Sequence, residues 1–170
     1  MALIKITEER YKRVIELYFM WKELNTEIKK DFTRGINLPE AITEPICCYV
    51  NNFLHSTKNG SEDAIDEKNY SKVQIKATSN FKNDLTSFGP KSEFNELHFV
   101  RLNQAEDKMY LYKIPVNKLA DVQVNVGETF EEQQNQGRRP RFSIINKYIE
   151  PDNIKEYAIV DLKTGEIERL

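Results

Sequence analysis

The hydrophobic pattern of this 170-residue chain changes its period near residue 61, and that change limits the folds that the chain can adopt. From Thr7, a potential N-cap, to about Lys30, apolar residues recur every three or four positions, as in an amphipathic helix. After residue 61, apolar and polar residues alternate, as in strands that bury one face. Helices followed by strands predict one α/β (or α+β-like) domain over residues 1–170, with helices flanking a mixed central sheet.

The N-terminal part, about residues 7–56, is expected to be helical. Its first apolar stripe is wider than one packing surface needs, so the stripe is buried either within its own domain or partly against a second subunit. Asn37 and Glu40 have the spacing of a capping box for a second helix. Pro45 lacks a backbone N–H, so this helix either kinks there or restarts from Thr43.

Three hairpins are predicted beyond residue 60. The first covers about residues 61–79, where "SEDAI" and "SKVQIKATS" flank a turn, and the second joins "ELHFVRLN" to "KMYLYKIP". A capping box of Thr129 and Glu132 then opens a short helix, before a strand at "RFSII". The last hairpin joins "AIVDL" to "EIERL".

Composition excludes some classes of protein and leaves others open. A hydrophobic content of 39% and a charged content of 31% are typical of a globular domain. No apolar run is long enough to span a membrane, and the N-terminus lacks a signal-peptide core, so we expect a cytoplasmic protein without a membrane partner. Cys47 and Cys48 are adjacent and the two histidines are far apart, which gives no zinc-site spacing and predicts buried, reduced thiols.

The first hairpin places three chemically useful side chains near one point. Its turn would fold Asp63 back toward Gln74 and Lys76. A carboxylate and an amide oxygen can hold Mg²⁺, and a nearby lysine can orient a water molecule or stabilise negative charge. These parts suit metal-assisted attack of water on a phosphodiester. Taken alone, the same pattern also fits a solvated hairpin face.

Several blocks of sequence resemble known nucleases. The stretch "SEDAI…VQIKATS" resembles the active-site hairpin of the PD-(D/E)XK nuclease superfamily. More closely, "RGINLPEAITEP", "VQIKATSNF" with "TSFGPKSEF", and "GRRPRFSI" are similar to a family of small type II restriction endonucleases that cut short GC-rich palindromes such as GCNGC. The similarity runs from about Trp21 through Ile144. It implies a restriction-endonuclease-like core that uses Mg²⁺ to cut double-stranded DNA.

The resemblance also implies roles for individual residues. Asp63 corresponds to the metal-binding aspartate and Lys76 to the catalytic lysine, while Gln74 stands where most of the superfamily has Glu or Asp. Gln74 can offer a carbonyl oxygen to the metal but no charge. A glutamate from the preceding helix often joins such sites, and here we favour Glu44 over Glu40. Asp66, the rival of Asp63, is typical of a turn.

Base reading is expected from residues 129–146, and backbone contacts from the segment after the catalytic strand. Arginine matches guanine, and glutamine matches adenine, in the major groove. The alternative for this basic segment is a loop that touches only phosphates. The candidate DNA-binding residues are Gln133, Gln136, Arg138, Arg139 and Arg141, together with Ser79, Asn80, Lys82, Ser87 and Lys91.

The sequence therefore predicts a Mg²⁺-dependent type II restriction endonuclease. A symmetric homodimer would match a palindromic site, and the resemblance implies a cognate DNA methyltransferase in the same system. Two alternatives stay open: a non-catalytic DNA-binding protein in which Gln74 marks a decayed metal site, and a repair or modification-dependent nuclease on the same core.

Overall fold

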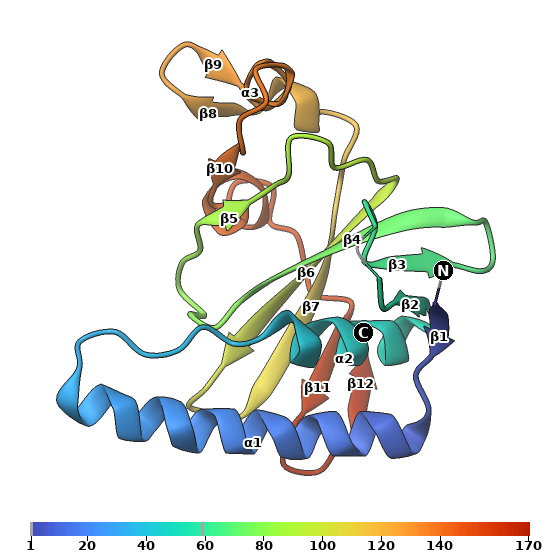
Figure 1. The fold of residues 1–170 in the computed structure, drawn as a ribbon, viewed down its shortest axis with the longest axis vertical. Coiled ribbons are helices and arrows are strands. Elements are labelled where there is room, and N and C mark those ends of the chain that lie inside the picture. The colour runs from blue at the N-terminus through green and yellow to red at the C-terminus, as the bar shows by residue number, and fades with distance from the viewer. Residues whose placement is uncertain (1, 59) are drawn as a thin grey trace.

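The structure, a computed structural model, describes residues 2–58 and 60–170. At its centre is an eight-stranded sheet in the order β1-β2-β3-β4-β6-β7-β11-β12 (Figure 1). Strands β4 and β6 are parallel and the other neighbours antiparallel. The sheet strands are β1 (Leu3–Lys5), β2 (Leu54–Ser56), β3 (Ala64–Asp66), β4 (Ser71–Thr78), β6 (Glu96–Asn103), β7 (Lys108–Ile114), β11 (Ala158–Asp161) and β12 (Ile167–Arg169).

The remaining elements lie outside this sheet. Helices α1 and α2 cover one face, and the segment that contains α3 projects at the end of the molecule away from α1 (Figure 1). Two short pairs, β5 with β10 and β8 with β9, lie outside the main sheet. The bounds are α1 (Glu8–Asp31), α2 (Glu40–Asn51), β5 (Thr86–Ser87), η1 (Leu119–Asp121), β8 (Gln123–Asn125), β9 (Glu128–Thr129), α3 (Phe130–Asn135), β10 (Arg141–Phe142) and the π-helix η2 (Ile145–Ile149).

Two hydrophobic clusters fill the two sides of the sheet. Along β6, Val100 belongs to the cluster under α1 and α2, whereas Phe99 belongs to the cluster that contains Phe88, Phe130 and Phe142. The alternation follows from the period of a strand, which sends successive side chains to opposite faces. A mixed α/β fold with a mixed central sheet is thus confirmed.

Helix α1 begins where the sequence predicts. The hydroxyl of Thr7 accepts a hydrogen bond from the backbone N–H of Arg10 at 3.1 Å. The wide apolar stripe is used mostly by the chain's own core, since Val14, Tyr18 and Trp21 are buried. The stripe therefore does not by itself call for a second subunit.

Helix α2 differs from the prediction at both ends. The Asn37–Glu40 capping box is wrong: the helix begins at Glu40 with Pro39 at the N-cap, and no side chain caps it. The residue before a proline is disfavoured from helical geometry, so residues 37 and 38 cannot form a first turn. The helix then runs through Pro45 without restarting at Thr43.

The predicted helical region also extends too far. The chain leaves α2 at Asn52, which adopts the left-handed conformation (φ 61°), and residues 54–56 form strand β2 between β1 and β3. By contrast, the predicted hairpins are confirmed as β3–β4, β6–β7 and β11–β12. The capping box of Thr129 and Glu132 is confirmed at the start of α3. Cys47 and Cys48 are buried free thiols, as predicted.

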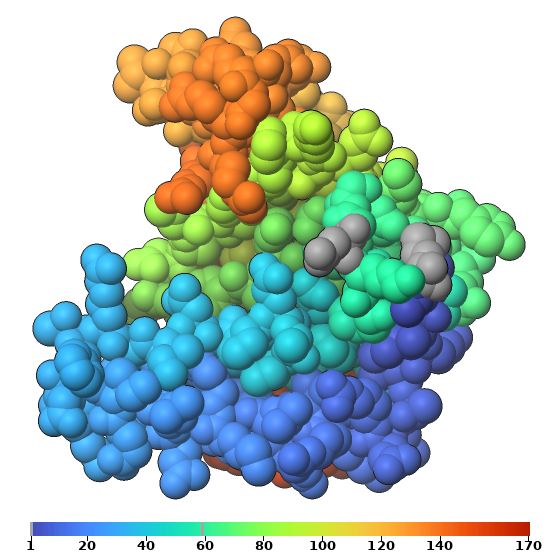
Figure 2. All heavy atoms as spheres, viewed as in Figure 1, coloured from blue at the N-terminus to red at the C-terminus, as the bar shows by residue number. Residues whose placement is uncertain are grey.

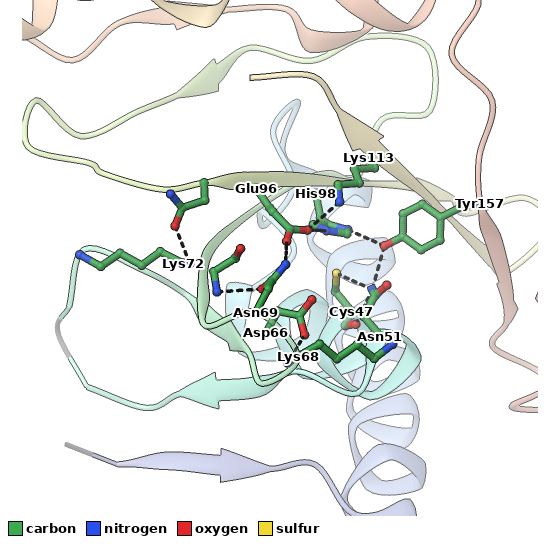
Figure 3. A network of polar contacts seen from close by, with 12 residues as sticks. Cys47, Asn51, Asp66, Lys68, Asn69, Lys72, Glu96, His98, Lys113 and Tyr157 are labelled. Carbon is green, nitrogen blue, oxygen red and sulfur yellow. Dashed lines mark hydrogen bonds and ion pairs between the residues drawn. The ribbon is translucent and has the colours of Figure 1, made fainter. Parts of the chain in front are cut away.

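A buried polar network joins α2, β6 and the C-terminal segment (Figure 3). His98 on β6 lies with Nδ1 2.7 Å from the hydroxyl of Tyr157 and Nε2 3.4 Å from a carboxylate oxygen of Glu96. Asn51 on α2 donates to the same Tyr157 hydroxyl at 2.8 Å, and Lys113 pairs with Glu96 at 2.9 Å. Burial disfavours the imidazolium form and lowers the pKa of His98 to about 4.

We expect this histidine to make the protein sensitive to acid. The unfolded state, with a pKa of about 6.5, takes up the proton before the folded state does. The contribution of His98 to the free energy of unfolding is therefore fully present above about pH 6.5. It is lost as the pH falls toward 4, by up to about 3 kcal/mol. Urea unfolding at about pH 7 and about pH 4.5 should show a smaller loss for His98→Gln than for the wild type. Equal losses in the two proteins would contradict this assignment.

Candidate active site

The β3–β4 hairpin brings Asp63 and Gln74 into contact. Asp63 directly precedes β3, and its backbone N–H donates to the carbonyl of Val73 at 3.0 Å, which extends the ladder by one residue. Its carboxylate oxygen Oδ2 accepts hydrogen bonds from the N–H of Ile75 at 2.7 Å and from the side-chain amide of Gln74. The turn therefore folds the carboxylate onto the next strand.

Lys76 lies on the same side of β4 as Gln74. Its Nζ is 5.5 Å from the ring centroid of Phe88, a buried residue of the cluster opposite α1 and α2. The ammonium group therefore lies over an aromatic face, and Lys76 lines a cleft beside β4. Two residues on one strand thus present an amide and an ammonium group beside one carboxylate.

Helix α2 and strand β2 add a second carboxylate with a histidine partner. Glu44 and His55 line a pocket of about 420 Å³ together with Asp63. His55 Nε2 lies 2.8 Å from Oε2 of Glu44, and both side chains are largely buried. Glu40 lines the same pocket but is exposed. Sequence reasoning missed His55, because its place opposite Ala64 depends on β2 being a strand.

The electrostatic environment of Asp63 is unusual for an aspartate. Burial and the nearby Glu44 carboxylate raise the pKa of Asp63 to about 7, and the Ile75 N–H and Lys76 oppose this shift only in part. Glu40 contributes least, which favours Glu44 as the partner carboxylate. A cation between the two carboxylates would relieve their repulsion.

The donor set fits a hard divalent cation. Among residues 2–58 and 60–170, no three His, Cys, Asp or Glu side chains form a cluster that could hold a metal. Asp63 and Glu44 line one pocket, and the side-chain amide of Gln74 contacts Asp63. Mg²⁺ is typically bound through one or two carboxylates and keeps several waters, so this oxygen-donating set is sufficient.

Asp66, the rival of Asp63, is the last residue of β3, where the turn to β4 begins. Its Oδ1 accepts a hydrogen bond from the N–H of Lys68 at 3.0 Å, which stabilises the turn. This is the turn role that the sequence predicts for it.

A cleft of about 530 Å³ runs past the C-terminal half of β4. Lys76 lines it from β4, Leu38 from the α1–α2 linker, Ser87 from β5 and Arg139 from the segment before β10. Figure 2 shows a recess in this region, between the part formed by residues 123–141 (orange) and the α1–α2 linker (light blue). The catalytic candidate Lys76 and the base-reading candidate Arg139 therefore share one cleft.

The cleft brings together several of the predicted DNA-binding residues. Ser79, Asn80 and Ser87 line it, and Lys82 lines an adjoining hollow. Arg139 Nε is 3.5 Å from the hydroxyl of Ser87, while the exposed Arg141 pairs with Ser87 across β10 and β5.

Other members of the predicted set are paired with Glu128 or lie outside the cleft. Gln133 is buried, and its amide donates to Glu128 at 2.8 Å. Arg138 forms an ion pair with the same Glu128 at 2.9 Å. Gln136 and Lys91 are exposed but are not among the residues that line the cleft. The sequence gives no sign of this division, because it depends on where Glu128 folds.

Comparison with known proteins now identifies the family. A family model described as "Bsp6I restriction endonuclease" matches residues 6–151. The chain belongs to the Bsp6I restriction endonuclease family. It is 43% identical over 169 residues to "Type II restriction enzyme Bsp6I" from Bacillus sp. (strain RFL6), which covers 98% of this chain and 97% of the relative.

Membership of this family establishes the class of activity. The protein is a site-specific deoxyribonuclease of the type II restriction class, which acts on double-stranded DNA. This favours a site-specific restriction endonuclease over the two alternatives left open by the sequence, a non-catalytic DNA-binding protein with a decayed metal site and a repair or modification-dependent nuclease. Within the described residues, no helix is long and apolar enough to cross a membrane.

Proposed function

We propose that this endonuclease has a PD-(D/E)XK core and uses Mg²⁺ to cut at a short GC-rich palindrome such as GCNGC. One observation carries the proposal. A single hairpin supplies Asp63, Gln74 and Lys76, and Lys76 lines the cleft that also contains Arg139. Chemistry and base reading would then act on one bound duplex.

Asp63, Gln74 and Glu44 would hold the metal, which supplies Lewis acidity and lowers the pKa of a bound water. The Nε2 group of Gln74 now faces Asp63, so its amide would turn to present Oε1. His55 would hold Glu44 in place through the contact between Nε2 and Oε2. A histidine in this position limits the rotamers open to the glutamate.

Lys76 would carry the proton and charge chemistry on the protein side. Its ammonium group would orient the attacking water and donate to the phosphate oxygens as negative charge develops on them. The attacking water would lose a proton to the solvent as its oxygen bonds to phosphorus. The bond from phosphorus to the 3′ oxygen would break, and the 3′ oxygen would take up a proton from the solvent, leaving a 5′ phosphate and a 3′ hydroxyl. The contact between Lys76 Nζ and the ring of Phe88 would help to hold the ammonium group in place.

Arg139 and Arg141 are the proposed base readers, because both are exposed and flank Ser87 at the cleft. Arg138 and Gln133, held by Glu128, would contribute once that pair opens on DNA. The phosphate backbone would contact the remaining candidates. These are Ser79, Asn80, Lys82, Ser87, Lys91 and Gln136.

A homodimer is proposed from the symmetry of the target. A two-fold dimer places one active site on each strand of a palindrome. Leu24 on α1 is 52% exposed and is a candidate contact. We also propose that a cognate methyltransferase modifies the same sites in the cell that makes this enzyme.

Cleavage of unmethylated plasmid tests this proposal. Purified protein is incubated with plasmid in Mg²⁺ and in EDTA, and the fragment ends are sequenced. We expect discrete fragments in the reaction with Mg²⁺ and none in the reaction with EDTA. The fragment ends should fall at one GC-rich palindrome. Cleavage in EDTA would contradict the proposed dependence on Mg²⁺. Fragment ends at an AT-rich or asymmetric sequence would contradict the proposed recognition site.

A further inference from the structure

We infer that Asp84 is a positioning residue that couples base reading to cleavage, an inference that rests on the roles proposed above for Lys76 and Arg139. Asp84 lies in the loop between β4 and β5, and it lines the cleft that both of these residues line. The loop follows the catalytic strand directly. The segment that carries the candidate base readers comes some 55 residues later in the chain but folds against it.

The carboxylate of Asp84 joins these two segments. Its Oδ1 accepts hydrogen bonds from the hydroxyl of Ser143 at 2.7 Å and from the N–H of Ile145 at 3.1 Å. Its Oδ2 accepts from the N–H of Ile144 at 2.8 Å and from the hydroxyl of Thr86 at 2.6 Å. Three of these four donors belong to the segment just after β10.

The loop that carries Asp84 is itself held firmly to the sheet. The hydroxyl of Thr78, the last residue of β4, is 3.0 Å from the carbonyl of Asn83. The guanidinium of Arg101 on β6 donates twice to the carbonyl of Phe81, at 3.1 and 2.5 Å, and stacks on its ring. A movement of Asp84 relative to β4 would break these contacts. The position of Asp84 is therefore fixed relative to the catalytic strand β4, and its hydrogen bonds hold the segment after β10 at a set position relative to that strand.

The other contacts between the base-reading segment and the chain after this loop lie around β5: the N–H of Phe88 donates to the carbonyl of Pro140 at 3.0 Å, the amide of Gln134 donates to the carbonyl of Gly89 at 2.8 Å, and the rings of Phe88 and Phe142 stack. Strands β5 and β10 pair through two residues each, Thr86 and Ser87 with Phe142 and Arg141. So short a ladder is weak without further contacts. Arg139 adds one long contact to Ser87 at 3.5 Å. Without the carboxylate, the segment after β10 would lose three hydrogen bonds to the loop that follows the catalytic strand, and the arginines would be held less firmly relative to Lys76. A small misplacement at a reacting centre can lower the rate by about 100-fold.

The test compares Asp84→Asn with a matched aspartate elsewhere. Asparagine keeps one acceptor oxygen but turns an NH₂ group toward the remaining donors. Asp161 caps the β11–β12 turn through the N–H groups of Lys163 and Thr164, away from the cleft, so Asp161→Asn is the control. Cleavage rates are measured on an oligonucleotide with the cognate site and on one with a single changed base pair.

We expect Asp84→Asn to lower kcat on the cognate site by about 10- to 100-fold while cleavage of the altered site changes much less. The discrimination between the sites should fall for Asp84→Asn and stay constant for Asp161→Asn. Because Asp84 acts through Arg139, the double variant with Arg139→Ala should be hardly worse than Arg139→Ala alone. Equal losses on both sites, or additive losses in the double variant, would overturn the inference.

Two further variants keep the outcomes separate. If Asp84→Asn does not fold, Ser143→Ala removes one of the four donors and should still lower the discrimination, so an unchanged ratio there overturns the inference. Lys76→Ala tests the proposed function itself. Full cleavage by Lys76→Ala would overturn the proposed active site, whereas an inactive Lys76→Ala beside an unaffected Asp84→Asn would overturn only the role of Asp84.

Discussion

Replacing Lys76 with alanine should lower the rate of DNA cleavage by about 10³-fold or more and leave specific DNA binding largely intact. Lys76 lines the cleft beside β4 and its charge acts on Asp63, so the ammonium group is near the place where negative charge would develop on the phosphate. Its interactions are made mainly in the transition state, so the loss should appear in kcat more than in KM. Single-turnover cleavage and a DNA-binding titration of the same protein separate the two effects.

Lys76→Met and Lys82→Ala provide controls for this prediction. Methionine keeps an unbranched apolar side chain near Phe88 but carries no charge. We therefore expect Lys76→Met to be as stable as the wild type and as inactive as Lys76→Ala. Lys82 is exposed on the following loop, and its loss should weaken binding by less than about tenfold and reduce its salt dependence. A Lys76→Met enzyme that still cleaves at the wild-type rate would remove this lysine from the mechanism.

The sequence predicts the long elements well because each of them repeats its hydrophobic period several times. Helix α1 and the strands β4, β6 and β7 span three or more repeats, so local patterning and global packing agree. The turn residues between β3 and β4, including Asp66, add a local signal of their own.

Short elements carry no such signal. The strand predicted at "RFSII" forms only over Arg141–Phe142 (β10), because the π-helix η2 begins at Ile145. Strands β1 and β2 are three residues long and β5 is two, which is too short for any period to be recognised. Their geometry comes from tertiary pairing alone. The predicted capping box at Asn37 and Glu40 is wrong for a different reason. The spacing of the two residues fits a capping box, but Pro39 between them prevents the helical first turn.

The candidate site divides along the same line. Asp63, Gln74 and Lys76 could be placed from the sequence because one local hairpin brings them together. His55 and Asp84 could not, since their partners come from α2 and from the segment after β10. For the same reason the sequence treats Gln133 and Arg138 as free side chains, although Glu128 holds both.

Asp63→Asn should have opposite effects on activity and on stability. We expect it to abolish cleavage, by about 10³-fold or more, because the site loses the carboxylate that would bind metal. In the metal-free protein at about pH 8, the same change should raise the free energy of unfolding by up to about 4 kcal/mol. Asparagine carries no charge and can still accept the hydrogen bond from Ile75.

The sign of the stability effect follows from the raised pKa of Asp63. Its pKa is about 7 in the folded state and near 3.9 in the unfolded state. Between about pH 4 and pH 7 the folded protein keeps a proton that the unfolded chain has released, so stability falls as the pH rises through this window. The difference in free energy of unfolding between the wild type and Asp63→Asn should therefore be small near pH 4 and reach its full size above pH 7.

Mg²⁺ connects the two effects. Added at about pH 8, it should raise the thermal midpoint of the wild type by binding the folded state, and it should leave Asp63→Asn almost unchanged. Asp66→Asn, a change in the turn three residues away, should keep both the cleavage and the response to Mg²⁺. If Mg²⁺ stabilises Asp63→Asn as much as the wild type, the cation binds elsewhere. In that case the burial of Asp63 beside Glu44 serves some purpose other than holding a metal.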